Sequence, residues 1–315
     1  MKQVLSAAVK YLPLAIAVSI IVVGAFFVPW KEVLPYIISM SPLALGAVIA
    51  LAFVYYFGRI LRYSFILRTL GQPTGLHRIT LAYFVAQPMT LLPGGEAYRS
   101  VMLKKYGNVA IRDGLPSVFA QSLTENMGLI IIALIGAIVL NRHIVIVVGV
   151  GLVVGAIMAL LHFYNIRKSH KMINKLPTVD ISHYRIKIFI DKNRELLRGG
   201  NLLILFVTSF ISTFAGIGIV YVIASSFGAD INVFQAAIAF TLPMILQYAS
   251  FLPGGLGVNE HGSVGILLLL GGIALPAAVA ITIVVRLMTL GFGIVMGYVA
   301  IGLLKVYTLR KQLVS

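Results

Sequence analysis

The stretch that decides the fold is FLPGGLGVNEHGSVG, residues 251–265, which carries five glycines, a proline, an asparagine, a glutamate and a histidine. It lies between TLPMILQYAS and ILLLLGG, which are apolar enough to be buried in hydrocarbon. A second stretch, LLPGGEAYRS at residues 91–100, interrupts an earlier apolar run in the same way. Irregular backbone at membrane depth is tolerated only where protein or a water-filled cavity satisfies its polar groups. The two stretches therefore indicate a cavity inside a membrane protein.

The composition of the 315-residue chain places most of it in lipid, because 60% of the residues are hydrophobic and only 11% are charged. A soluble domain of this length could not hide so much apolar surface. The net charge is +16, and the basic residues fall in short stretches between apolar segments, as the positive-inside rule describes. Aromatic and basic residues do not interleave, which argues against nucleic-acid binding. The chain has no cysteine, which excludes disulfides and thiol chemistry.

Six apolar segments are long enough to cross a bilayer, since about 20 residues cover ~30 Å of hydrocarbon. The first has a basic start and no small-residue cleavage site, so we expect it to stay as an uncleaved span. The connector at residues 164–201 is too short for a core of its own and is either a surface helix or a solvated loop. The predicted spans are Tyr11–Pro29, Ser41–Arg59, Leu115–Leu140, Ile144–His162, Leu202–Ser225 and Pro276–Leu303.

The charge distribution decides whether the two interrupted regions, residues 79–103 and 232–272, cross the bilayer or fold back. A full crossing of the first region would place the basic connector at residues 164–201 outside, against the positive-inside rule. With the first region re-entrant, a full crossing of the second would place the basic C-terminal tail outside. We therefore expect an all-α polytopic membrane protein with about six full transmembrane helices plus two re-entrant helical hairpins, and both termini in the cytoplasm. Residues 1–140 and 141–315 then form inverted repeats of one transmembrane domain, an arrangement that places a binding site at the midplane in transporters.

Five ionisable side chains are predicted to converge near the midplane, because each lies beside an interrupted region or about 15 Å into a span. They are Glu96, Arg99, Glu125, Glu260 and Arg286. A charge at the centre of an isolated helix costs at least ~2.5–3.5 kcal/mol, so these groups should face one another or water. They either form internal salt bridges that fix helix packing or bind substrate directly.

Arg99 is the leading candidate for a phosphate ligand, because a guanidinium at a hairpin tip offers bidentate donors. Glu96, three residues earlier, would hold Arg99 in place or exchange partners when phosphate arrives. Arg62 lies one turn after Arg59, and this pair either collects phosphate or belongs to a snorkelling helix end. The amides that either line the cavity or join neighbouring helices are Gln87, Gln121, Asn126 and Gln247.

The glycines of the two loops permit unusual turns and expose N–H groups at the start of a half-helix, whose positive dipole end attracts anions. They either cradle an anion or only let the hairpins fold tightly. In the second loop, Asn259 and His261 are candidate substrate-binding groups, and His261 has no partner at metal-ligand spacing, so no metal site is expected. The candidate glycines are Gly94, Gly95, Gly254, Gly255 and Gly257.

The two loops carry a family resemblance. LPGGLGVNEHGSVGILLLLG resembles the Pro-Gly-Gly-x-Gly-x-x-Glu signature of the lysylphosphatidylglycerol synthase transmembrane-region family, also called the flippase-like domain family. LLPGGEAYRSVMLKKYG resembles the Pro-Gly and Glu-x-x-Arg signature of that family's first half. The resemblance covers nearly the whole chain but not the large aminoacyl-transferase domain of the bifunctional members. It implies the lipid-translocating half alone, in a family associated with moving aminoacylated phospholipids or polyprenyl-phosphate-linked sugars across the bilayer.

Together these observations predict a lipid flippase of the cell membrane, not an enzyme, with no cofactor. A phosphate-bearing headgroup would enter the cavity while its tails stay in the bilayer, with Arg99 and Arg286 binding the phosphate in turn. The alternatives are an ion- or proton-coupled transporter of a small anionic solute, and a membrane-embedded lipid-phosphate enzyme subunit with His261 and Glu260 as its only candidate reactive groups. The expected partners are membrane lipids and no nucleic acid, with a homo-oligomer and a lipid-modifying synthase or glycosyltransferase left open.

Overall fold

The structure, a computed structural model, describes residues 28–91, 95–140, 191–250 and 252–314, with a few isolated positions beside them. The predicted spans Tyr11–Pro29 and Ile144–His162 lie mostly outside the described residues. Gly94 and most of the predicted cytoplasmic connector, residues 164–190, also lie outside them.

Every element in the described ranges is a helix, and five helical segments are long and apolar enough to cross a membrane. Their outer faces expose large apolar side chains such as Phe53, Phe57 and Leu303, as lipid contact requires. The chain is therefore an all-α polytopic membrane protein. The five segments are α3 (Pro42–Thr69), α6 (Ile111–Leu140), α9 (Gly199–Ser226), α10 (Val233–Ser250) and α12 (Leu275–Arg286), which continues through η5 (Leu287–Gly291) into α13 (Phe292–Val314).

Four predicted spans coincide with these helices, but α3 is longer than the sequence suggested. The prediction ended the span at Arg59, whereas the helix continues to Thr69 with Arg59 and Arg62 buried inside the bundle. The basic residues do not end the span because a carboxylate from another helix neutralises them, as described below. The buried part of α3 thus extends beyond the point where hydropathy alone would stop it.

The centre of the bundle is the packing of α3 against α9, the most extensive helix contact in the structure. Small residues allow this approach, as is common where van der Waals contact rather than water drives helix association. A side chain at Gly58 would come within 3.0 Å of the Ser212 backbone nitrogen. A glycine also allows α9 to approach α10, because a side chain at Gly216 would enter the ring of Phe240 on α10. The short helix α2 (Trp30–Ile38) packs beside α12.

The last long helix contains one π-helical turn, η5, between α12 and α13. Single π turns are often found at functional positions of long helices. The Tyr56 hydroxyl on α3 donates a hydrogen bond to the Thr289 backbone carbonyl in this turn. Any side chain at Gly293 would overlap the same hydroxyl. The turn is therefore held directly against α3.

The first interrupted region folds back on itself. Its second arm, α5 with the π turn η3, packs against its first arm, α4, and ends at Asn108 in the left-handed conformation with φ 57°. The region comprises α4 (Leu76–Ala86), η1 (Gln87–Leu91), η2 (Gly95–Ala97), α5 (Tyr98–Met102) and η3 (Leu103–Gly107).

The second interrupted region is a longer helical hairpin made of α10, η4 (Pro253–Gly255) and α11 (Val258–Gly271). The Gln235 side chain at the start of α10 donates a hydrogen bond to the Leu270 carbonyl at the end of α11, so the two ends of the hairpin lie together. With 18 residues, α10 is itself long enough to count as a span, whereas α11 has only 14.

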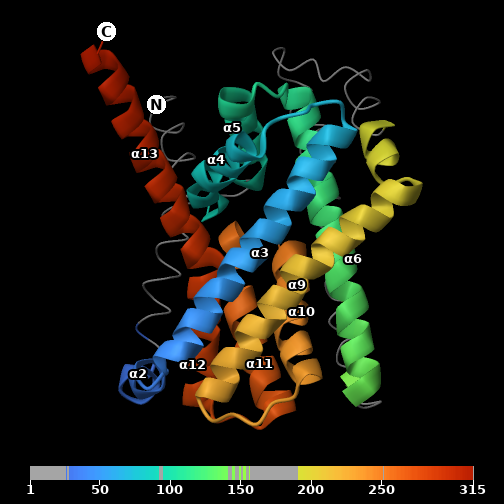
Figure 1. The fold of residues 1–315 in the computed structure, drawn as a ribbon. Coiled ribbons are helices and arrows are strands. Elements are labelled where there is room, and N and C mark those ends of the chain that lie inside the picture. Colours follow the sequence, from blue (N-terminus) through green and yellow to red (C-terminus); the bar gives the residue numbers. More distant parts are fainter. Residues whose placement is uncertain are drawn as a thin grey trace, which may run out of the picture.

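The tips of the two hairpins meet inside the bundle. Figure 1 shows α4 and α5 at the end of the molecule where α13 terminates, and α10 with α11 toward the opposite end, where α2 lies. Between them η1 packs against η4, and a side chain at Gly254 would lie 3.3 Å from the Leu91 side chain. The division into inverted repeats at residue 140 stays a prediction.

The predicted topology can be tested by labelling single cysteines with a membrane-impermeant maleimide, since the chain has no cysteine of its own. We expect Lys104→Cys and Lys171→Cys to react from the cytoplasmic side and Lys31→Cys from the opposite side, because a re-entrant first hairpin returns the chain to its starting face. Reaction of positions 104 and 171 from different sides would disprove that arrangement.

The α9–α10 contact predicts a stability change. Gly216→Ala should lower the unfolding free energy by about 1–3 kcal/mol, the usual cost of overpacking, because its methyl group meets the Phe240 ring. Gly46→Ala is the matched control, since a side chain there meets nothing within 4 Å. Thermal unfolding in detergent measures both. Phe240→Leu should restore part of the loss in the double variant, and a loss unaffected by Phe240→Leu would contradict this packing.

Candidate functional site

A buried ion cluster joins α3 to α6. The Glu125 carboxylate on α6 lies 2.8 Å from Arg59 Nη2 and 2.7 Å from Arg62 Nη2. Arg62 has no exposed surface, and Arg59 and Glu125 are nearly as buried. Residues three apart on a helix point to one side, which is why one carboxylate reaches both guanidinium groups. Removing charges from water is expensive, so this group depends on its mutual pairing.

Arg59 also extends the cluster to two tyrosines. Its Nη1 donates to the Tyr55 hydroxyl one turn earlier on α3, at 3.0 Å. Its Nη2 donates to the Tyr248 hydroxyl on α10, also at 3.0 Å. Tyr248 belongs to the second hairpin and Arg59 to the first half of the chain. The cluster therefore connects the two halves as well as α3 and α6.

Arg99 is buried in the first hairpin with only 2% of its surface exposed, but it has no carboxylate within ion-pair distance among the described residues. Its guanidinium lies 4.4 Å above the ring of Tyr83 and donates a long, 3.4 Å hydrogen bond to the Gln121 side-chain oxygen. The Glu96 carboxylate accepts a hydrogen bond from Ser122 at 3.1 Å instead of pairing with Arg99. A cation–π contact and one weak bond are modest compensation for a buried charge.

Several buried donors around these arginines have no acceptor among the described residues. Buried polar groups in proteins are nearly always hydrogen-bonded, so a concentration of unpaired donors points to a group rich in acceptor oxygens. The unpaired hydroxyl and amide groups belong to side chains of α4, α5 and α6 near Arg99. The atoms are Arg59 Nε, Arg62 Nε and Nη1, Arg99 Nε, Tyr83 Oη, Ser100 Oγ and Gln121 Nε2.

At the second loop, in contrast, each of the three nitrogen atoms of Arg286 has an acceptor. Its Nε donates to Glu260 Oε1 at 2.6 Å, its Nη1 to the Gln247 side chain at 3.2 Å, and its Nη2 to the Gly254 carbonyl at 2.7 Å. The other Glu260 oxygen accepts the Gly257 backbone N–H at 2.7 Å. The Arg286–Glu260 pair thus fixes the Pro-Gly-Gly loop, which is the salt-bridge alternative left open by the sequence.

The loop glycines are used for folding. Gly254, Gly255 and Gly257 have φ of 60°, 67° and 86°, which strongly favours glycine. The Gly255 N–H donates to the Leu252 carbonyl and the Gly257 N–H to Glu260, so these two predicted anion donors already have partners. In the first loop, a side chain at Gly95 would overlap the Met89 carbonyl. Tight folding therefore accounts for these glycines.

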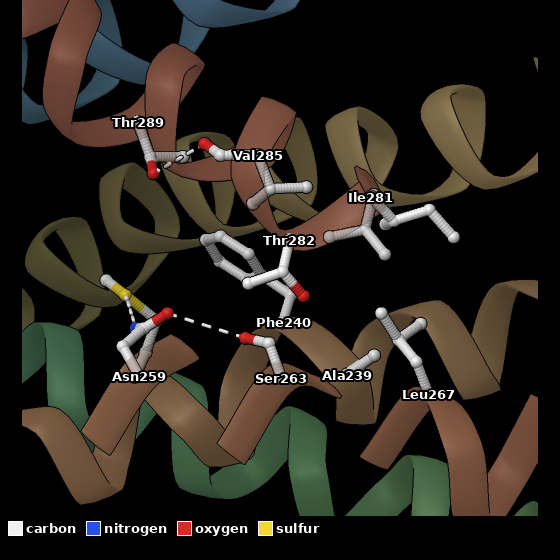
Figure 2. A pocket seen from close by; sticks show the side chains of 11 residues that line it. Ala239, Phe240, Asn259, Ser263, Leu267, Ile281, Thr282, Val285 and Thr289 are labelled. Carbon is white, nitrogen blue, oxygen red and sulfur yellow. Dashed lines mark hydrogen bonds between the residues drawn. The ribbon is translucent and has the colours of Figure 1, made fainter. Parts of the chain in front are cut away.

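The remaining predicted residues of the second loop lie apart from the arginine cluster, by which we mean Arg59, Arg62 and Arg99. His261 is exposed, and its Nδ1 lies 2.7 Å from the Gly257 carbonyl. Asn259 donates to Gln247 at 2.8 Å and lines a small pocket with Ser263, Thr282 and Thr289. Figure 2 shows Asn259 and Ser263 on one wall of this pocket and Thr282 on the facing wall, with apolar side chains between them. The pocket contains no charged side chain and does not provide a phosphate site.

The comparison with protein families matches residues 12–297 to the lysylphosphatidylglycerol synthase TM region. The chain belongs to this family. No curated protein and no solved structure matches the chain. The family assignment confirms the resemblance drawn from the two Pro-Gly-Gly loops and indicates a membrane protein with a lipid-related function.

The sequence predicted most of the charged residues of the site but not which of them pair. Glu125 pairs with the two arginines of α3, and Glu96 pairs with no arginine in the described residues. Three tyrosines were not predicted as part of the site: Tyr55, Tyr83 and Tyr248. For Tyr55 a signal existed, since it precedes Arg59 by one helical turn.

The two ion pairs predict unequal effects on stability. Glu125→Ala should lower the unfolding free energy by about 3–5 kcal/mol, because it leaves two buried arginines unpaired. Glu260→Ala should cost less, because the Glu260 side chain is 32% exposed and Arg286 would keep its hydrogen bonds to Gln247 and Gly254. Unfolding of each variant in detergent gives the comparison. Equal losses for the two variants would contradict the difference in burial.

Proposed function

We propose that this protein is a lipid translocase that moves a phosphate-bearing lipid headgroup across the bilayer. The observation that carries the proposal is the excess of buried guanidinium donors over carboxylates around Arg99. Arg59 and Arg62 share a single carboxylate, and Arg99 has none within ion-pair distance among the described residues. A phosphate group supplies negative charge and several acceptor oxygens together.

The position of the cluster supports a route for a headgroup. It lies where the first hairpin, α3, α6 and the tip of the second hairpin come together. The outer faces of these helices are apolar and suit contact with acyl chains. A headgroup inside and tails outside would keep both parts of the lipid in a favourable environment. Because Arg62 and Arg99 are almost fully buried, the hairpins must separate from α3 and α6 to admit the headgroup.

The two arginines predicted from the sequence to bind phosphate would have different roles. Arg99, with its unpaired Nε, binds the phosphate together with Arg62. Arg286 holds the second loop through Glu260 and Gly254, so its effect on transport is indirect. The substrates that the family resemblance suggests are aminoacylated phospholipids and polyprenyl-phosphate-linked sugars, and both carry the phosphate that this site would bind. Transport would leave the lipid chemically unchanged.

The test is headgroup translocation in proteoliposomes containing the full chain, with fluorescent phosphatidylglycerol and a fluorescent polyprenyl-phosphate sugar as probes. Arg99→Gln should reduce translocation by roughly 10-fold to 100-fold, because charged hydrogen bonds contribute about 1.5–3 kcal/mol each. Arg78→Gln, which removes an exposed arginine of α4, is the control and should transport as the wild type does. Wild-type rates in Arg99→Gln, or no translocation of either probe by the wild type, would refute the proposal.

A further inference from the structure

The carboxylates of the bundle differ in what neutralises them. Glu125 has Arg59 and Arg62, and Glu260 has Arg286. Asp113, at the start of α6, pairs with Lys192 and accepts a hydrogen bond from Gln72. Glu96 is different, because the described residues provide it with no cation within ion-pair distance and only the Ser122 hydroxyl as a donor.

Glu96 is also accessible. It lies in η2 at the tip of the first hairpin and is half-buried, whereas Glu125 is almost fully buried. Arg99 follows it by three residues on the same arm. A carboxylate that is only half-buried and has no salt bridge can gain or lose a proton without leaving a buried arginine unpaired. Glu125 and Glu260 cannot, because protonating either would remove the partner of an arginine.

We propose that Glu96 is the proton-binding group that couples anion binding at the arginine cluster to protons. The inference rests on the proposed function, because it concerns the same cluster. Arg59, Arg62 and Arg99 carry three positive charges. Ionised Glu96 and Glu125 together supply two negative charges, and protonation of Glu96 leaves only one. Coulomb interactions are strong in a low-dielectric interior, so the added positive charge strengthens anion binding. Glu96 takes up the proton when the anion binds and releases it when the anion leaves.

Among the described residues, the elements packed against η2 offer no second carboxylate that lacks a cation. They are η1, which carries no titratable side chain, α5, which carries Tyr98 and Arg99, and α6, whose carboxylates Asp113 and Glu125 are both ion-paired. The charge of Glu96 also acts on Tyr63 of α3 and Tyr248 of α10.

The coupling has a definite sign. Protonation of Glu96 favours the anion, and by reciprocity a bound anion favours the proton. Anion affinity therefore rises as the pH falls. In a membrane with a proton gradient, a headgroup phosphate and a proton would move together, which gives the translocase an energy source other than nucleotide hydrolysis.

The test measures sulfate binding to the purified full chain in detergent, by the stabilisation that sulfate gives against thermal unfolding between about pH 4 and pH 8. Sulfate keeps its two charges throughout this range, so any pH dependence belongs to the protein. For the wild type we expect a change in affinity between about 5-fold and 150-fold, the usual range for coupled sites. Glu96→Gln should bind sulfate tightly and equally at every pH. Glu32→Gln removes an exposed carboxylate of α2 and should behave as the wild type.

A second variant covers the case in which Glu96→Gln does not fold. Ser122→Ala removes the one donor that favours the ionised carboxylate, so the midpoint of the pH dependence should move to higher pH. A pH dependence retained in Glu96→Gln, a midpoint unmoved in Ser122→Ala, or sulfate affinity independent of pH in the wild type would overturn the coupling while leaving the anion site intact. Failure of the wild type to bind sulfate at any pH would overturn the anion site itself, and with it the proposed function.

Discussion

The structure depends on one carboxylate held between two arginines in a low-dielectric interior. Glu125 on α6 neutralises Arg59 and Arg62 on α3, and this allows α3 to continue through the bundle past two positive charges. Without that partner, both arginines would have to reach the membrane surface. The Tyr248 hydroxyl then joins Arg59 to the second hairpin. One ion cluster therefore fixes the depth of α3, its contact with α6 and its contact with α10.

The two Pro-Gly-Gly loops have similar sequences but different electrostatic surroundings. In the second loop, Arg286 and Glu260 neutralise each other and use their hydrogen bonds on the loop backbone. In the first, Arg99 and Glu96 are close in sequence but bind different partners. The charges of the second loop are thus neutralised within the loop region. In the first loop, Arg99 has no carboxylate partner among the described residues and keeps an unpaired N–H donor. This asymmetry is why we propose the anion site and the proton-binding group at the first hairpin.

Hydropathy and charge were enough to predict the helical class, the positions of four spans and the folding back of both interrupted regions. They also predicted Glu125 to lie far along its helix from the membrane face, since a depth follows from the residue count, and Glu125 is indeed buried inside the bundle. Pairing could not be predicted in the same way. Whether Glu125 faces Arg62 or Arg286 depends on how each helix is rotated and how closely it packs, which glycines such as Gly58 decide through contacts far apart in sequence. The use of the Gly257 N–H by Glu260 is likewise a tertiary feature.

The π turn η5 joins two of these features mechanically. It follows Arg286 directly. Tyr56 of α3 holds it through a hydrogen bond to the Thr289 carbonyl and through close contact at Gly293. A swing of α13 about that contact would act as a lever on Arg286, and through Arg286 on the backbone of the second loop. A displacement of the C-terminal part of α13 would therefore be transmitted along the helix to Arg286 and the second Pro-Gly-Gly loop.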